Sequence, residues 1–352
     1  MRGTKTGFIG YVRQKGITCP ALHCIIHQGA LCGQSIRLNE TFKTVVEIIK
    51  KVRGGNRALL HRQLQAFLEE VDAEFSDLLL YNNVRWLSSG KSLERFFGIR
   101  KKISEFLKTF VKGDTSEFRE KLENADFLRE LAFLTDITGH LNDLNLRLQG
   151  KYHLISDLVG SIDSFQKKLK LFENALSRND LTHFQSCKKL SEDYEEHKKP
   201  DFSDFVENLR EISVEFDTRC QDFESMRPDI NLFNNPLGVE VEQQEADLQM
   251  ELCDLQADPF PSSRKERGPQ FFKLLEADRF PKLRRFGQKI TSVFGSTYLC
   301  EVIFSAMKSI KSDKRNRLAD ASLLHALRLA KSSEGIDIKT LVADFERPQV
   351  SH

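Results

Sequence analysis

The sequence predicts a mostly α-helical protein. From Asn39 onward, apolar residues recur at steps of three and four in one segment after another, a spacing that gives an amphipathic helix its buried face. Proline, glycine and serine interrupt this pattern at 228–236 and again at 259–269, where helices are expected to end. The 352 residues with 40% apolar side chains are enough for a sizeable core, and no apolar run reaches membrane-spanning length.

The first 36 residues differ from the rest of the chain. Leu22 to Ile26 is predicted to be a short buried strand, because it is apolar, brief and bounded by Pro20 and Gly29. A single strand without partner strands is expected to be the remnant of a larger sheet. Residues 1–36 are therefore predicted to be what remains of a mixed α/β domain.

The same stretch contains four side chains that bind soft metals, spaced C-x4-C-x2-H-x4-C: Cys19, Cys24, His27 and Cys32. Such a set could hold tetrahedral zinc. However, Ile25 and Ile26 between the ligands favour a strand over the turn that a zinc knuckle needs. A buried structural pair of Cys24 and His27 is the preferred interpretation, and no metal is expected.

Residues 37–258 are predicted to be entirely helical. Asn39 can cap the first helix, which is expected to stop at Gly54 and Gly55. The apolar stripes that define the later helices run over 60–71, 96–110, 127–148, 158–176 and 205–223. No fixed repeat period connects them, which argues against a solenoid.

Between two of these helices lies the sequence NNVRWLSSGKSLERFF, in which Ser88 to Gly90 is predicted to be a loop. Its tryptophan, Trp86, is the only one in the chain. Trp86 could anchor the core. Alternatively, Arg85 and Trp86 together could bind a phosphate and stack on an unpaired base.

Residues 259–268 are predicted to be a linker to a carboxyl-terminal region at 269–331, with a flexible polar tail at 332–352. This region contains a predicted helix from Ser296 to Leu318 and a last helix near Asp320. The carboxylate of Glu301 stands in the first turn of the former. It is either a first-turn glutamate favoured by the helix dipole or one ligand of a metal site.

Charge is distributed unevenly along the chain. Residues 1–112 carry 19 Lys/Arg against 9 Asp/Glu, residues 190–255 carry 5 against 19, and residues 281–317 carry 9 against 2. The basic blocks could contact a polyanion. Alternatively, basic and acidic faces could attract each other within the fold or across a dimer.

Neither a secretory signal nor a catalytic signature is found in the sequence. The first residues lack an apolar signal core, and seven scattered cysteines suit a reducing compartment, so an intracellular protein is expected. P-loop, GxGxxG, GxSxG, HExxH and kinase motifs are absent. A two-metal phosphoryl-transfer site needs at least three converging carboxylates, and Glu301 has no evident partner.

Four motifs, in order along residues 3–331, carry a family resemblance: LHCIIHQGALCGQSI, NNVRWLSSGKSLERFF, LAFLTDITGHLNDLNLRLQGK and FGSTYLCEVIFSAMKSIKSDKRNRL. Together they resemble the domesticated transposases of the hAT class, of the Charlie type, which are related to the zinc-finger BED domain-containing proteins. The resemblance implies a ribonuclease H-like fold interrupted by a large all-helical insertion, followed by a hAT-type dimerisation region.

The resemblance also implies roles for individual residues. Cys24 and His27 match a C-x2-H motif that follows the family's second catalytic aspartate. Arg85 and Trp86 match an RW motif whose tryptophan stacks on DNA, and Glu301 matches the third catalytic acid. In the family both aspartates precede the segment at which this sequence begins, so Glu301 is expected to be vestigial and the ancestral magnesium site incomplete, with no cofactor.

The resulting prediction is a catalytically inactive, transposase-derived nuclear protein. It is expected to act in protein interaction and dimerisation, with weak nucleic-acid binding and no membrane contact. Apolar residues left exposed by a truncated sheet, among them Phe294, Tyr298 and Phe304, are expected to form the interface of a homodimer or of a complex with related transposase-derived proteins. The alternative is a fragment of a longer, active hAT transposase that carries out metal-dependent phosphoryl transfer.

Overall fold

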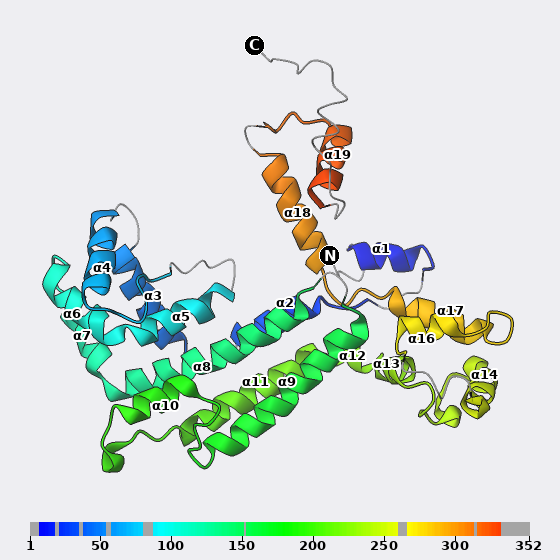
Figure 1. Ribbon diagram of the computed structural model, residues 1–352, viewed down its shortest axis with the longest axis horizontal. Helices are drawn as coiled ribbons and strands as arrows, with labels where there is room; N and C mark the ends of the chain where they lie inside the picture. The colour runs from blue at the N-terminus through cyan, green and yellow to red at the C-terminus, as the bar shows by residue number, and fades with distance from the viewer. Residues whose placement is uncertain are drawn as a thin grey trace. The chain divides into compact units, whose positions relative to one another are not determined.

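A computed structural model describes residues 7–17, 21–34, 38–53, 58–79, 87–150, 153–259, 266–312 and 315–331. These residues are mostly helical, and none of them lies in a β-strand. The mostly α class is thereby confirmed. The ribonuclease H-like part of the prediction is not confirmed, because that fold requires strands. The chain divides into two compact units, Met1–Ser296 and Thr297–His352 (Figure 1).

The predicted strand at Leu22–Ile26 is wrong. Residues 21–24 have no regular structure, and Ile25 begins helix α2, Ile25–Gln34. Ile25 and Cys32 are both fully buried. They lie seven residues apart, which places them on the same face of a helix, so the apolar run is one end of a helical stripe rather than a strand.

The first unit is built from helices of very different length. Besides α2, its α-helices are α1 (Phe8–Gln14), α3 (Asn39–Arg53), α4 (Ala58–Glu70), α5 (Leu87–Gly98), α6 (Arg100–Phe110), α7 (Ser116–Glu123), α8 (Ala125–Leu148), α9 (Ile155–Leu176), α10 (Gln185–Glu192), α11 (Val206–Arg219), α12 (Gln221–Glu224), α13 (Arg227–Asn234), α14 (Ala246–Ala257), α16 (Pro269–Leu274) and α17 (Pro281–Thr291). The predicted helices at 39–53, 60–71, 127–148 and 158–176 are confirmed as α3, α4, α8 and α9.

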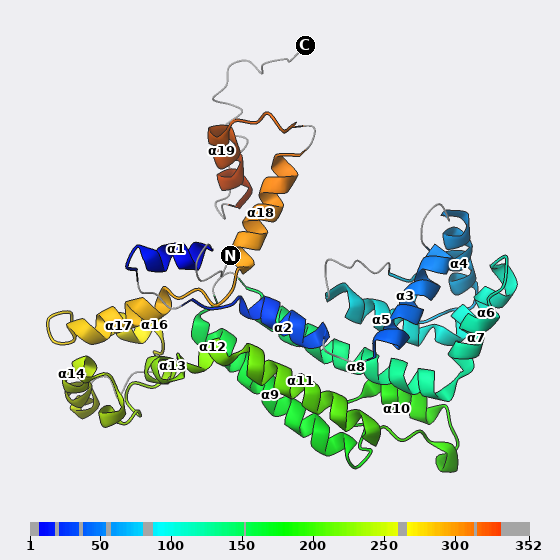
Figure 2. The ribbon, with the colours of Figure 1, turned by 180° about the vertical axis from the view of Figure 1, so that it is seen from behind.

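Helix α8 is the central element of this unit. Asn124 caps its amino terminus by accepting a hydrogen bond from the backbone N–H of Phe127 at 2.9 Å. Helices α2, α3, α5, α7, α9 and α10 all pack against it. Figures 1 and 2 show α2 and α9 running beside α8 from opposite viewpoints. Because neighbours surround α8, its buried residues occupy most of its circumference.

Two sequence boundaries were predicted incorrectly around α5. Ser88 to Gly90 belongs to the first turn of α5 and is not a loop. Here the small residue allows close packing, because a Cβ on Gly90 would lie 3.4 Å from the carbonyl oxygen of Thr138 on α8. The apolar stripe at 96–110, predicted as one helix, is divided between α5 and α6 at Gly98–Ile99.

The carboxyl-terminal part of the first unit has its own aromatic core. Phe272 stacks on Phe233 with ring centroids 5.3 Å apart and also contacts Phe286 at 5.9 Å. Part of the apolar surface of this region was expected to be exposed, but these five residues are buried: Phe271, Phe272, Leu275, Phe280 and Phe286. That expectation is wrong for them because α13, α14, α16 and α17 pack together without any strand.

The second unit contains helices α18 (Tyr298–Ile310) and α19 (Asp320–Lys331), which pack on each other. Helix α18 ends eight residues earlier than the predicted Leu318. In the described part of this unit, Leu323 is the one apolar side chain that is buried. The predicted divisions at 36/37 and 258/259 stay predictions, and most of the predicted linker 259–268 lies outside the described residues.

Alanine substitutions at two glycines, one closely packed and one not, test the packing of the first unit. A Cβ on Gly98 would lie 2.8 Å from Cε2 of Phe75, so Gly98→Ala must displace the aromatic ring and should lower the free energy of unfolding by about 1–3 kcal/mol. Gly160, inside α9, has nothing within 4 Å of the added Cβ. Gly160→Ala should therefore raise stability by about 0.5–1 kcal/mol through helix propensity. Urea denaturation of both variants measures this, and equal effects would contradict the packing.

Candidate functional site

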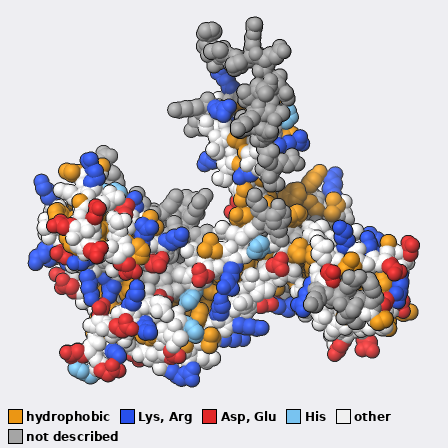
Figure 3. All heavy atoms as spheres, in the orientation of Figure 1, with side chains coloured by type: hydrophobic (Ala, Val, Ile, Leu, Met, Phe, Trp, Pro, Cys, Tyr) orange, Lys and Arg blue, Asp and Glu red, His pale blue; other side chains and the backbone are white. Residues whose placement is uncertain are grey.

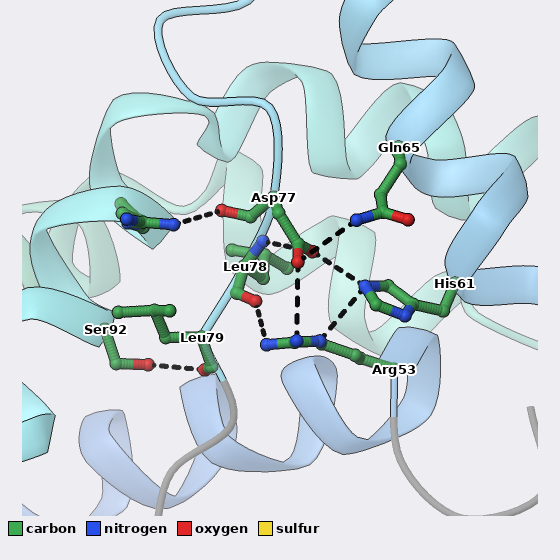
Figure 4. A network of polar contacts seen from close by, with 8 residues as sticks. Arg53, His61, Gln65, Asp77, Leu78, Leu79 and Ser92 are labelled. Carbon is green, nitrogen blue, oxygen red and sulfur yellow. Dashed lines mark hydrogen bonds and ion pairs between the residues drawn. The ribbon is translucent and has the colours of Figure 1, made fainter. Parts of the chain in front are cut away.

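A polar network holds the chain immediately before the predicted DNA-binding motif (Figure 4). Arg85 and Trp86 themselves lie outside the described residues. The network is centred on Asp77, whose carboxylate accepts hydrogen bonds from Gln65 Nε2 at 3.3 Å and from the N–H of Leu78 at 2.8 Å. It also pairs with Arg53 Nη2 at 3.4 Å and His61 Nε2 at 2.9 Å.

The same network fixes the two residues after Asp77. Arg53 Nη1 donates to the carbonyl oxygen of Leu78, and Ser92 Oγ donates to that of Leu79 at 2.9 Å. Helices α3, α4 and α5 thus each contribute a side chain to residues 77–79 (Figure 4). Arg53 and His61 both pair with Asp77, so the role of the network is to position residues 77–79. The spacing of these residues in the sequence did not predict the network.

A polar groove of about 390 Å³ lies between α5, α8 and α10. Helix α5 contributes Lys91 and Glu94, and α8 contributes Asp136, His140 and Asp143. Glu74, His183, Ser186 and Lys189 also line it. Five of these nine residues lie in two of the motifs that carry the family resemblance, but the sequence did not indicate that they meet the other four.

Asp136 has a structural role in this groove. Its carboxylate accepts hydrogen bonds from the backbone N–H of Ser186 at 2.9 Å and of Cys187 at 3.0 Å, which satisfies the first turn of α10. Burial raises the pKa of the Asp136 carboxyl, and these hydrogen bonds oppose the shift. Asp136 therefore joins α8 to α10 and is not free to act as a general base.

His140 is fixed at the other side of the groove. Its ring stacks on Phe172 with centroids 4.4 Å apart, and its Nε2 lies 2.9 Å from the carbonyl oxygen of His183. Because a carbonyl only accepts, Nε2 carries the proton.

The charge of the groove disfavours a polyanion. Four carboxylates, those of Glu74, Glu94, Asp136 and Asp143, line it together with two lysines, and Lys189 already pairs with Glu74 at 3.5 Å. A nucleic-acid backbone would meet net negative charge here. The groove is better suited to polar or basic groups of a protein partner.

Glu301 is placed as a first-turn residue of α18 and is exposed. Its Oε1 accepts a hydrogen bond from the Thr297 hydroxyl at 3.0 Å. Among the described residues, no group of three or more His, Cys, Asp or Glu could hold a metal ion. The place of Glu301 in the first turn of α18 is the one that the helix-dipole interpretation requires.

Cys24 and His27 do not form the predicted buried pair. Cys24 is half-buried and precedes α2, whereas His27 lies on the first turn of α2 and is exposed. The histidine that makes a long-range contact is His23, whose Nδ1 lies 2.7 Å from Asp222 Oδ2. Cys19 lies outside the described residues.

Part of the charge asymmetry is neutralised within the chain. On basic helix α17, Lys282 lies 3.9 Å from Asp247 and Lys289 lies 3.9 Å from Asp229. Glu251 accepts hydrogen bonds from the backbone N–H groups of Lys282 at 3.0 Å and Leu283 at 2.9 Å, and so caps α17. For α17, the basic residues are therefore attracted to acidic residues of the same chain, which is one of the two interpretations given above.

The predicted interface residues fall in different units. Phe294 is 79% exposed and precedes the boundary at Ser296. Phe304 is 60% exposed on α18, and Tyr298 at the start of that helix is half-buried. Ile303, on α18 as well, is 47% exposed.

Comparison with known proteins identifies relatives. Residues 23–177, which contain α2 to α9, match the FAM200-GTF2IRD2-like family model, described as the FAM200/GTF2IRD2 helical domain. General transcription factor II-I repeat domain-containing protein 2 of Bos taurus is 33% identical over 316 residues, which cover 88% of this chain and 32% of that protein. Its counterpart in Mus musculus is 30% identical over 321 residues, covering 89% and 33%.

The chain is a homologue of this protein. It spans about a third of the length of the curated relatives it matches. The four motifs quoted above also resemble the transposase-derived region of general transcription factor II-I repeat domain-containing protein 2, and that resemblance is confirmed. No solved structure matches the chain. None of the described helices is long and apolar enough to cross a membrane.

Substitution of Asp136 tests its role as a cap. Asp136→Ala leaves two backbone N–H groups without an acceptor and should lower the free energy of unfolding by about 1–3 kcal/mol. Asp136→Asn keeps an acceptor and should cost less. If the two variants were equally unstable, the cap would not be the source of the effect.

The pH dependence of the same variants has a defined sign. Because burial raises the pKa of Asp136 from 3.8, the folded state holds this proton more tightly than the unfolded state. The wild-type protein should therefore lose stability relative to Asp136→Asn as pH rises through the interval just above 3.8. Thermal unfolding followed by circular dichroism at several pH values measures the difference. A difference that stays constant over this interval would contradict the raised pKa.

Glu301→Ala is expected to change stability only slightly, because the carboxylate is exposed and makes one hydrogen bond within its own helix turn. If Glu301 belonged to a functional metal site, magnesium would raise the melting temperature of the wild-type protein and not that of the variant. No magnesium-dependent difference between the two is expected.

Proposed function

We propose that this chain is a catalytically inactive, transposase-derived protein that acts in the nucleus as a protein-interaction and self-association module. Its homology to general transcription factor II-I repeat domain-containing protein 2 supports the origin and the nuclear location. The observation that carries self-association is the lack of a core in the described part of the second unit.

Helices α18 and α19 are too short to be stable alone. They have 13 and 12 residues, and isolated helices of this length are marginal in water unless an apolar face is packed. Yet Leu299, Ile303 and Phe304 on α18 and Leu324 and Leu329 on α19 are exposed. Contact with another apolar surface would supply the missing burial.

A second copy of the chain is the partner proposed for this surface. The resemblance of residues 269–331 to a hAT dimerisation region supports this choice. A symmetric pairing would place the same apolar residues of both copies together, as an isologous interface requires. Related transposase-derived proteins with a similar region would be alternative partners.

Catalysis is not part of the proposed function. One carboxylate, Glu301, cannot hold two metal ions in line with attacking and leaving oxygens, so no cofactor is proposed. The competing function is metal-dependent DNA cleavage by a longer hAT transposase of which this chain is a fragment. Incubation of the purified chain with supercoiled plasmid and magnesium or manganese distinguishes the two. Nicking that Glu301→Ala abolishes would overturn the proposal.

Weak nucleic-acid binding is proposed as a secondary property of residues 1–112, whose excess of basic residues supports it. Helix α17 is a poor candidate, because acidic residues of α13 and α14 already pair with it. Binding should weaken steeply as salt is raised. Trp86→Ala should weaken single-strand binding by about 1–3 kcal/mol if the ring stacks on a base. A large loss of stability would instead indicate a core tryptophan.

Sedimentation equilibrium tests self-association directly. The wild-type chain, of 40.5 kDa, should form dimers at micromolar concentration. Phe304→Asp should shift the equilibrium to monomer, because a carboxylate in an apolar interface loses its hydration. Ser305→Asp is the matched control, since it adds the same charge to the same helix at an exposed polar position.

The same two variants can also disprove self-association through α18. A wild-type chain that remains monomeric, or a Phe304→Asp variant that associates as well as Ser305→Asp, would show that this face of α18 is not an interface.

A further inference from the structure

A small depression between α8 and α9 combines two cationic side chains with the hydroxyl of Ser164. Its volume is about 20 Å³, and its polar lining comes from α8 and α9: His140, Asp143, Arg147, Ser161, Ser164 and Lys168. That volume is enough for an oxygen atom and not for a small molecule. A ligand would therefore insert one atom into the depression, and the rest of the ligand would lie on the surrounding surface.

Two cations of this depression are not paired with any carboxylate of the described residues. Neither Arg147 nor Lys168 makes an ion pair or a side-chain hydrogen bond with any residue that the structure describes. The Ser164 hydroxyl is likewise without a partner there. By contrast, Arg100, Arg129 and Arg227 of the same unit each pair with a carboxylate.

The depression adjoins the polar groove between α5, α8 and α10. His140 and Asp143 line both, so the two sites form one continuous surface. The depression is positive and the groove carries excess carboxylates. Figure 3 shows Lys and Arg side chains beside His side chains over α8 to α10, with acidic side chains nearby.

We propose that this surface binds a peptide in which a phosphorylated serine or threonine stands next to arginine or lysine residues. The phosphate lies on Arg147 and Lys168 with one oxygen toward Ser164, and the basic residues lie against Glu94 and Asp143. This inference rests on the proposed role as a protein-interaction module and specifies the partner of one of its sites.

Phosphate fits the depression better than a carboxylate does. It carries a charge of about −1.5 to −2 at neutral pH and three strong acceptor oxygens. Arginine presents a planar set of donors that matches such an anion, and lysine adds a compact charge. The free hydroxyl of Ser164 supplies a further donor.

A peptide fits better than a nucleic acid. A strand of DNA repeats its phosphates along its whole length, so those beyond the depression would face Glu74, Glu94 and Asp136 in the groove. A peptide can place a single phosphate at the positive end and a basic side chain at the negative end. Charge complementarity of this kind sets both the orientation and the specificity of binding.

Fluorescence anisotropy of the full chain with a labelled peptide tests the proposal. The probe is a short polyalanine peptide with one phosphoserine followed by two arginines. We expect it to bind at least about tenfold more tightly than its unphosphorylated form. The double variant Arg147→Ala/Lys168→Ala should remove that difference without changing the melting temperature, because neither side chain is paired in the folded protein.

Three controls make the result specific. Lys167→Ala removes an exposed charge next to Lys168 that does not line the depression, and it should leave binding unchanged. Glu94→Gln/Asp143→Asn should weaken binding of the probe but not of a phosphopeptide in which alanine replaces both arginines. Sedimentation of all these variants should match the wild type, which separates failure of this inference from failure of self-association.

Two results would overturn the inference. One is phosphorylation-independent binding, or an equal loss of binding in Lys167→Ala. The other is displacement of the probe by a single-stranded oligonucleotide that itself binds more tightly and is also lost in Arg147→Ala/Lys168→Ala, which would assign the surface to nucleic acid.

Discussion

The structure of the first unit depends on the burial of helix α8. Leu131, Ala132 and Phe133 are fully buried although consecutive residues of a helix point to different sides, so neighbours must cover most of α8. Helices α2, α5, α9 and α10 supply that cover. The solvent side of α8 retains Asp136, His140 and Asp143, and the polar groove lies there because helices bound it on both sides.

Sequence periodicity was enough to locate the long helices, since a helix with one buried face leaves its pattern in the chain. It failed where the pattern was short or the cause of a break was distant. Ile25 and Ile26 fit a strand pattern as well as a helical one, because a few apolar residues do not reveal their period. At the break, Gly98 packs closely against Phe75, which lies 23 residues earlier in the chain.

The candidate sites were predictable to a lesser degree. The sequence identified Glu301 and the Arg85–Trp86 motif through resemblance, but no spacing rule connects Arg53 with Asp77, or Arg147 with Lys168. Such groups meet only when several helices pack. Charge composition had a similar limit: it marked the basic and acidic blocks correctly, yet only the structure shows that α17 meets its acidic partners within the same chain.

Hydrogen exchange measured at several protein concentrations tests the central claim, that a self-sufficient helical unit is joined to one that needs a partner. Amides of α8 should be strongly protected at every concentration, because their protection depends on packing within one chain. Amides of α18 and α19 should gain protection only as concentration rises into the range of dimer formation. Equal protection of α18 and α19 at the lowest concentration would contradict the account.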